Sequence, residues 1–247
     1  MHSSGDYRTS WNIAVANADG TGLTEVTNFT GNESYPTWNY DGSMVLYWST
    51  KDMPSAYQMN LCWQSPVSNP SNLKVILTQW VGEWVMGRAS ISSTGTLLYV
   101  SGSDMMDLHA RDVGTSSDAV LRSESIRQAG KFLTLSAPTW SPDGLTIAFL
   151  EELKDTTTTG QLTFESVTVK VMDKEGKNVR TVIVAPAYGD NQIVQSLAWS
   201  PDGTKIAFTK PDGQLEAHIY VVNLDGSGFT AVTSAAGVTD LSISWSL

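Results

Sequence analysis

The sequence contains a single cysteine, Cys62, and has fewer basic residues (15 Lys and Arg) than acidic ones (25 Asp and Glu). One cysteine excludes an intrachain disulfide and leaves no cysteine pattern typical of zinc, so we interpret Cys62 as a small buried side chain on a strand. The formal net charge of −10 repels a phosphate backbone, and the sequence contains no basic run. Nucleic-acid binding is therefore not expected.

Long apolar runs and helical periodicity are also missing. No stretch approaches the roughly 18 apolar residues that indicate a membrane-spanning helix, and no long segment has a helical apolar period. The first ten residues, MHSSGDYRTS, have no apolar signal-peptide core. We interpret them as the remnant of a tag, so an export signal could have been removed. The chain does contain 41% apolar residues and nine Trp, enough for a sizeable core.

A thirteen-residue pattern occurs twice, as APTWSPDGLTIAF at 137–149 and as SLAWSPDGTKIAF at 196–208. Each copy predicts a strand, a tight turn and a second strand, because Pro presets φ, Asp caps its own backbone and Gly accepts positive φ. A third copy is YPTWNYDGSMVLYWS, and a degenerate fourth is RASISSTGTLLYVSG. The key positions are Trp38, Ile91, Trp140, Trp199 and Trp245, at spacings of 53, 49, 59 and 46 residues. This period predicts propeller blades of four strands each.

We therefore predict an all-β fold, a β-propeller of four-stranded antiparallel blades, with five blades as the first choice and six as the alternative. Residues 11–247 are expected to form one domain, preceded by residues 1–10. Its parts are a partial blade at 11–28, blades at 35–78, 84–122 (degenerate), 132–184 and 193–233, and a closing strand at 239–247. Because an open propeller would expose strand edges, we expect the N- and C-terminal strands to pair.

The pattern P-x-W-S-P-D-G-x-x-I-A-F, followed by I-Y-V-x-N-x-D-G-x-G, resembles the TolB-type, WD-repeat-like propeller family. The match is close over 137–233, good over 11–50 and weak over 84–128. The resemblance implies the fold and says little about function. The family includes periplasmic adaptors that bind partner proteins, propeller domains of serine oligopeptidases and many secreted or surface proteins. It implies an extracytoplasmic location: periplasmic, secreted or at the cell surface.

Residues suited to catalysis or metal binding are few, and each has a structural explanation. The sequence has no Gly-x-Ser-x-Gly elbow. Asp104 and Asp107 lie near His109 in the sequence, but such neighbours rarely face one another on a strand, so a Ser-His-Asp site is not expected. Turn pairs such as Asn223 and Asp225 offer two or three oxygens, whereas calcium needs about six, so we interpret them as hairpin caps. We predict no catalytic residue, metal ligand or cofactor.

Binding residues are expected on the face of the propeller that carries the loops between blades. These loops are longer and more variable than the tight turns on the opposite face. The loop at 79–88 holds two Trp and a Glu, which could stack on a sugar or grip a peptide; packing between blades is the alternative explanation of both Trp. The predicted binding residues are Trp80, Glu83, Trp84, Arg88, Tyr35, Tyr188 and Asp190.

Three functions from different classes fit these features. The first is a non-enzymatic binding or scaffold module that recognises a protein or glycan partner through the inter-blade loop face. The sequence does not indicate its oligomeric state. The second is a propeller that gates a serine peptidase or other hydrolase whose catalytic domain is absent from this chain. The third is a lyase or glycosidase acting in the central funnel, which would need two carboxylates, or a His and a carboxylate, converging on the axis.

Overall fold

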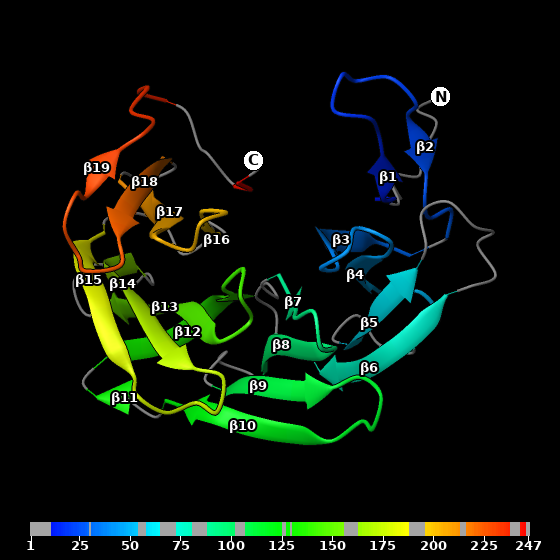
Figure 1. Ribbon diagram of the computed structural model, residues 1–247, viewed down its shortest axis with the longest axis horizontal. Helices are drawn as coiled ribbons and strands as arrows, with labels where there is room; N and C mark the ends of the chain where they lie inside the picture. The colour runs from blue at the N-terminus through cyan, green and yellow to red at the C-terminus, as the bar shows by residue number, and fades with distance from the viewer. Residues whose placement is uncertain are drawn as a thin grey trace, which may run out of the picture. The chain divides into compact units, whose positions relative to one another are not determined.

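The computed structural model describes twelve segments of the chain: 11–29, 31–53, 58–64, 73–80, 88–101, 107–124, 127–128, 130–155, 163–187, 196–212, 216–237 and 243–245. In these segments the regular structure is entirely β, without a helix (Figure 1). The sheets are antiparallel, and neighbouring strands in each sheet follow one another along the chain. This is the topology of propeller blades, so the predicted fold class, an all-β propeller of four-stranded antiparallel blades, is confirmed.

The chain forms two compact units, Met1–Trp80 and Val81–Leu247. The described part of the first unit contains a two-stranded sheet and one four-stranded blade with the order β3-β4-β5-β6. Its strands are β1 (Ala14–Val15), β2 (Thr24–Glu25), β3 (Glu33–Trp38), β4 (Val45–Ser49), β5 (Gln58–Gln64) and β6 (Lys74–Trp80).

The second unit contains three sheets in its described segments. The first is a four-stranded blade of β7 (Ser90–Ile91), β8 (Thr96–Ser101), β9 (Asp107–Asp112) and β10 (Asp118–Ser123). The second has five strands, β11 (Arg127–Gln128), β12 (Lys131–Trp140), β13 (Thr146–Asp155), β14 (Thr163–Asp173) and β15 (Arg180–Pro186). The third is a four-stranded blade of β16 (Leu197–Trp199), β17 (Lys205–Pro211), β18 (Ala217–Asn223) and β19 (Thr230–Ala231).

The repeated Ser-Pro-Asp-Gly segments form the same hydrogen-bonded turn. The amide of Ser141 donates to the carbonyl of Thr146 at 2.8 Å, and the amide of Gly144 donates to the carbonyl of Ser141 at 2.9 Å. The Ser141 hydroxyl donates to Oδ1 of Asp143 at 2.5 Å. Residues 200–205 repeat these three bonds at 2.9, 2.8 and 2.6 Å. The Gly has φ +69° in the first turn and +70° in the second, a backbone conformation that explains the Gly requirement.

The strand β13 shows how the sheets of the second unit share their cores. Ile147 and Phe149 pack with residues of β8 and β9, whereas Ala148 and Leu150 pack with residues of β16 and β17. All four side chains have no exposed area. Successive side chains of a strand point to opposite faces, so an unbroken apolar run is the pattern of a strand covered on both sides.

In the first unit, the two-stranded sheet packs on the neighbouring blade. Ile13 and Val26 from the segments of β1 and β2 pack with Val45 and Tyr47 of β4 and with Cys62 of β5. Cys62 is 1% exposed, which agrees with its interpretation as a small buried side chain on a strand. Burial raises the pKa of its thiol to about 12.

The predicted closing strand at 239–247 lies largely outside the described residues. Its described part, 243–245, is not assigned to a strand. The amide of Ile243 donates to the hydroxyl of Ser196, next to β16, at 3.2 Å. Pairing of the chain ends, the number of blades and the single-domain organisation therefore stay predictions. No helix in the described segments is long and apolar enough to cross a membrane.

Candidate functional site

Only two of the seven predicted binding residues have described side chains. Tyr35 belongs to the first unit and Arg88 to the second. Trp80 is the last residue of β6, and its side chain lies outside the described part of the structure. Glu83, Trp84, Tyr188 and Asp190 also lie outside the described residues. The structure therefore does not test the predicted cluster as a whole.

Tyr35 lies in a β-bulge near the start of β3. Its φ is +54°, and the register between β3 and β4 shifts between Ser34 and Thr37. Ala137, at the same place in the repeat, has φ +47° and lies in the corresponding register shift of β12. Each of these residues precedes a Pro, and the bulge redirects the chain there. Burial raises the pKa of the Tyr35 hydroxyl.

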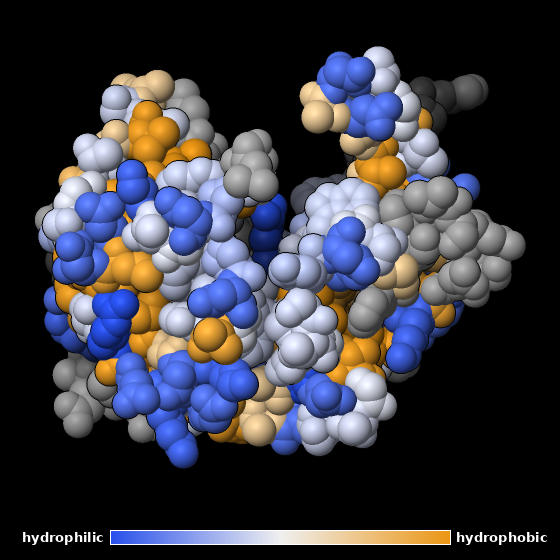
Figure 2. Space-filling model, viewed as in Figure 1, coloured by the Kyte–Doolittle hydropathy of each residue, from blue (hydrophilic) through white to orange (hydrophobic). Residues whose placement is uncertain are grey.

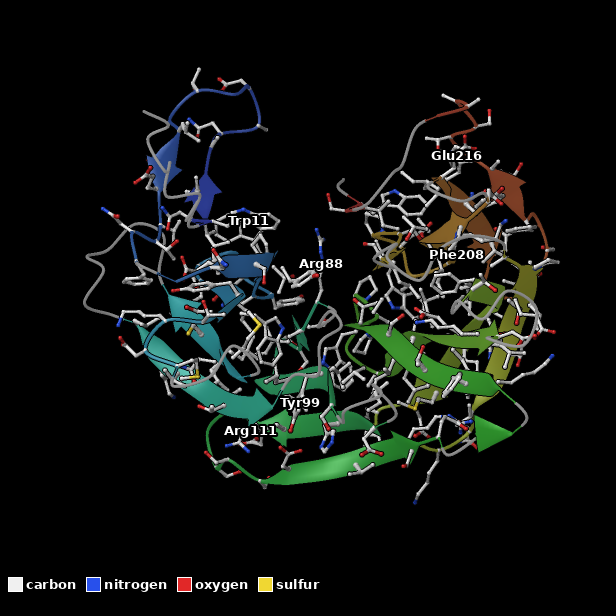
Figure 3. All side chains as sticks on the ribbon, turned by 180° about the vertical axis from the view of Figure 1, so that it is seen from behind. Trp11, Arg88, Tyr99, Arg111, Phe208 and Glu216 are labelled. Atoms are coloured by element: carbon white, nitrogen blue, oxygen red, sulfur yellow. The ribbon has the colours of Figure 1, made fainter. Side chains whose placement is uncertain are left out.

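Arg88 precedes β7 and its side chain is half-buried. Its Nη1 donates to the carbonyl of Ile243 at 3.5 Å, and burial lowers the pKa of its guanidinium. In Figure 3 the guanidinium projects beyond the start of β7, away from the sheet. Because Ile243 is also bonded to Ser196, Arg88 links the first blade of the second unit to its last blade.

His109 contacts residues that could not be identified from its neighbours in the sequence. Its Nε2 lies 2.7 Å from the hydroxyl of Ser101 on β8, and its Nδ1 lies 3.0 Å from Oδ1 of Asp118 on β10. Of the two acidic residues near it in the sequence, Asp107 accepts a hydrogen bond from Ser123 at 2.5 Å. Asp104 lies outside the described residues.

The carboxylate of Asp118 collects three donors from β8 and β9. The Tyr99 hydroxyl donates to Oδ2 at 2.5 Å, and Arg111 Nη1 donates to the same oxygen at 3.3 Å. His109 binds the other oxygen, Oδ1. Burial tends to raise the pKa of Asp118, but the hydrogen bonds from Tyr99 and His109 hold it below its ordinary value.

The Ser101–His109–Asp118 line has the order of a catalytic triad, but its surroundings favour a structural role. The rings of Tyr99 and His109 stack at a centroid distance of 4.7 Å, which packs the imidazole face to face with the phenol ring. The side chains all come from three adjacent strands of one blade. We interpret the five residues Tyr99, Ser101, His109, Arg111 and Asp118 as a cross-strand clamp.

The turn carboxylates are engaged in local hydrogen bonds. Oδ1 of Asp225 accepts the amide and the hydroxyl of Ser227 at 2.9 and 2.6 Å, and these bonds lower the pKa of Asp225. The hydroxyl of Ser200 and the amide of Thr204 contribute to lowering the pKa of Asp202 to about 2. Such bonds are those of a hairpin cap. In the described segments, no three His, Cys, Asp or Glu side chains gather in a way that could hold a metal ion.

A recess opens between the first two blades of the second unit, on the side of the tight turns. Its volume is about 290 Å³. Trp140, at the end of β12, forms one wall, and the remainder comes from turns on either side of it. The lining residues are Ser93, Thr94, Thr96, Trp140, Asp143, Gly144, Leu145, Lys174 and Glu175. Sequence reasoning missed this recess because it assigned binding to the opposite face.

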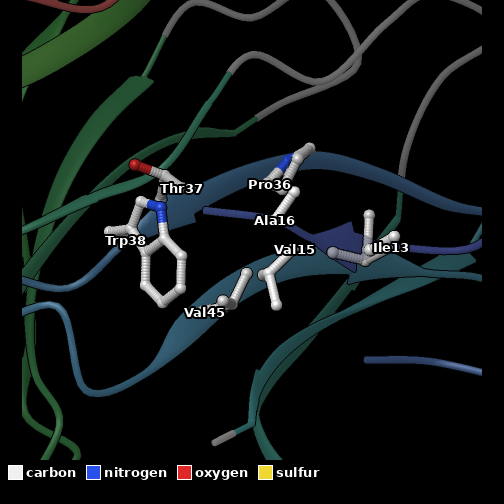
Figure 4. Close-up of a pocket in the computed structure, with 8 residues that line it drawn as sticks. Ile13, Val15, Ala16, Pro36, Thr37, Trp38 and Val45 are labelled. Carbon is white, nitrogen blue, oxygen red and sulfur yellow. The ribbon is translucent and has the colours of Figure 1, made fainter. Parts of the chain in front are cut away.

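A second recess, of about 230 Å³, lies in the first unit between β1 and the blade that follows it (Figure 4). Trp38 lies at its edge and is 49% exposed. Apart from Thr37, the lining consists of apolar side chains, namely Ile13, Ala14, Val15, Ala16, Pro36, Trp38 and Val45. It therefore lacks the charged side chains that the recess beside Trp140 has.

Exposed apolar side chains in the second unit concentrate on the outermost strands and their ends. Val184 on β15 is 60% exposed, and Val232 and Phe229, which flank β19, are 60% and 40% exposed. In Figure 2, orange surface on the sheets of this unit is interrupted by blue and white residues. This dispersal is ordinary for a protein surface.

No family model matches the chain, and no curated protein matches it. Similar folds occur among solved structures. A puromycin-hydrolysing peptidase from Mycobacterium tuberculosis has a TM-score of 0.54 at 18% identity, over 91% of this chain and 34% of that one. An oligogalacturonate lyase in complex with manganese has a TM-score of 0.51 at 12% identity, over 91% of this chain and 71% of that one.

TolB-type propellers are also among the similar structures, in line with the resemblance that the repeat motif indicated. TolB from Acinetobacter baumannii has a TM-score of 0.47 at 14% identity, over 87% of this chain. The chain spans 57% of the length of that protein. At these identities the likeness is one of fold.

Proposed function

We propose that this propeller is a non-enzymatic binding module that recognises a protein or glycan partner through its inter-blade loop face. Arg88 carries the proposal. Its side chain lies just before β7, the first strand of a blade, and its Nη1 donates to the Ile243 carbonyl at 3.5 Å. An arginine held in this way can make directional hydrogen bonds to a partner without first losing side-chain freedom.

The sequence of the preceding loop supports this assignment. The segment at 79–88 supplies Trp80, Glu83 and Trp84 next to Arg88. Trp and Arg are the side chains most enriched at the energetic centres of protein interfaces. We propose an extracytoplasmic location for this module, in line with the motif resemblance. A hydrolase-gating propeller and a funnel lyase or glycosidase stay alternatives, since the likeness to a peptidase and a lyase concerns the fold alone.

The proposal can be tested with immobilised protein in three forms: wild type, Trp84→Ala/Arg88→Ala, and Lys131→Ala/Glu165→Gln. The last removes an exposed ion pair of 2.7 Å elsewhere in the second unit and serves as the matched control. Extracts and a glycan array are screened, and candidate partners are then purified and titrated. We expect one partner that binds the wild type and the control equally and binds the loop variant at least tenfold more weakly. Partners that bind all three forms equally would refute the loop-face assignment.

A further inference from the structure

The recess beside Trp140 has a wall that is already fixed in place. The indole Nε1 of Trp140 donates to the carbonyl of Thr96 at 2.9 Å, and its backbone amide donates to the hydroxyl of Ser90 at 3.3 Å. Part of the ring packs on the core between the two blades. A ligand that stacks on this ring would not have to order it, so little conformational entropy is lost on binding.

The exposure of Trp140 differs from that of Trp199, its equivalent in the next blade. Trp199 also directs its indole N–H to the preceding sheet, at 3.4 Å from the carbonyl of Thr139, but it is only 7% exposed. Trp140 is half-buried and borders a recess of about 290 Å³. Trp38, at the same motif position in the first unit, is 49% exposed and borders the apolar recess there. The motif position is therefore covered in one blade and open in others, and the polar rim described next is what distinguishes the recess beside Trp140.

The rim of the recess is rich in groups that bind hydroxyls. Ser93 and Thr94 are exposed on the turn after β7. Lys174 and Glu175, on the turn after β14, are 52% and 55% exposed and lie 3.9 Å apart as an ion pair. Asp143 accepts its turn bonds through Oδ1. The rim thus combines ammonium and hydroxyl donors with carboxylate and hydroxyl acceptors.

One aromatic wall beside a polar rim fits a ligand with one apolar face and a hydroxyl-bearing edge. A pyranose ring has this form, because its axial C–H groups make a flat apolar face and its hydroxyls point outward. A purely apolar ligand would leave the charged rim desolvated without partners. The volume lies just below the roughly 300–1,000 Å³ of pockets for drug-sized ligands, which suits a ligand of about one ring.

We propose that the recess between the first two blades of the second unit is a saccharide subsite that takes one pyranose unit of a neutral glycan. The sugar stacks on Trp140, and its hydroxyls bond to the turn residues Ser93, Lys174 and Glu175. The subsite lies on the side of the tight turns, whereas the proposed partner surface around Arg88 lies on the side of the inter-blade loops. A substitution at one of the two sites should therefore leave binding at the other site intact.

The test is saturation-transfer NMR and calorimetry with the methyl β-glycosides of glucose and galactose, methyl α-mannoside and a blocked trialanine peptide. We expect at least one glycoside to bind with a Kd on the order of 1 mM, as befits a ligand of this size. Ser93→Tyr, which fills the recess from an exposed turn, should abolish binding. Lys174→Ala/Glu175→Gln should weaken binding at least fivefold, and Lys131→Ala/Glu165→Gln should leave the Kd unchanged.

Three results would overturn the proposed saccharide subsite. In the first, none of the glycosides shows saturable binding. In the second, both recess variants bind the glycoside as well as the wild type does, although thermal melts show that they are folded. In the third, the peptide competes for the recess and the glycosides do not. The Trp84→Ala/Arg88→Ala variant should bind the glycoside normally. Loss of glycoside binding in that variant alone would place the sugar at the loop face and would also contradict the subsite.

Discussion

The cross-strand clamp around Asp118 can be tested by the substitution Asp118→Asn. This change keeps the size of the side chain but leaves one acceptor oxygen where the carboxylate serves Tyr99, His109 and Arg111. Hydrogen bonds to a charged acceptor are worth about 1.5–3 kcal/mol each, less where water can replace them. The side chains of His109, Arg111 and Asp118 are 17%, 19% and 27% exposed. We therefore expect a loss of about 2–3 kcal/mol at pH 7.

Urea unfolding measures this loss. With a slope of about 2–3 kcal/mol per molar urea, the midpoint of Asp118→Asn should fall by about 1 M relative to the wild type. Glu165→Gln is the control, because Glu165 pairs with Lys131 at the surface, where both side chains are more than 40% exposed. Its midpoint should move by no more than about 0.3 M.

The pH dependence of the difference provides a second criterion. The folded structure holds the pKa of Asp118 below its ordinary value, so it favours the charged carboxylate. The stabilisation is then fully present above the unfolded pKa, about 4, and is lost as the pH falls through the lower folded value. The gap between wild type and Asp118→Asn should therefore narrow below about pH 4. A midpoint unchanged at pH 7, or a gap that persists undiminished in acid, would refute the clamp.

Three further predictions concern the cores and the buried charges. Phe149→Ala and Phe208→Ala each empty a fully buried site in a different core. Each should lower the free energy of unfolding, measured by urea titration, by about 3–5 kcal/mol. A loss below about 1 kcal/mol would contradict the core position of that residue. Glu152→Gln removes the anion 3.0 Å from buried Lys154 and should lower the free energy of unfolding by about 3–5 kcal/mol. An unchanged free energy of unfolding would show that the pair is solvated. Ellman's reagent at pH 8 should label Cys62 only on unfolding, because burial raises its pKa to about 12; rapid labelling of the native protein would contradict this.

The fold could be predicted from sequence because its determinants are local. The turn at 141–146 carries Pro, Asp and Gly at the positions that its hydrogen bonds require, and the run Thr146–Leu150 contains four consecutive apolar residues for a strand covered on both faces. Both signals lie within ten residues of chain, and the repeat presents them more than once. Local agreement of this kind across several levels is what specifies a fold.

The clamp could not be predicted, because it depends on how three strands align. Asp118 lies opposite Arg111, and Val120 lies opposite His109, yet the register of β9 and β10 shifts just beyond Val120. A shift of one residue moves side chains to the other face of a sheet. The sequence offers Asp107 as the nearest acid to His109, and only the pairing of the strands shows that Asp118, nine residues away, binds it.

The recess beside Trp140 illustrates a different limit of repeat-based reasoning. Trp140 and Trp199 occupy one motif position, and each bonds to a carbonyl of the preceding sheet, but the acceptor is Thr96 on β8 in one case and Thr139 on β12 in the other. The motif thus fixes the direction of the ring but not what covers its outer side. That cover depends on the turns of the blade before, where Ser93 and Thr94 replace the Pro-Asp of the regular copies. In a repeat protein, a ligand site is therefore best sought by comparing what covers the same motif position in different blades, because Trp199 is buried whereas Trp140 and Trp38 each border a recess.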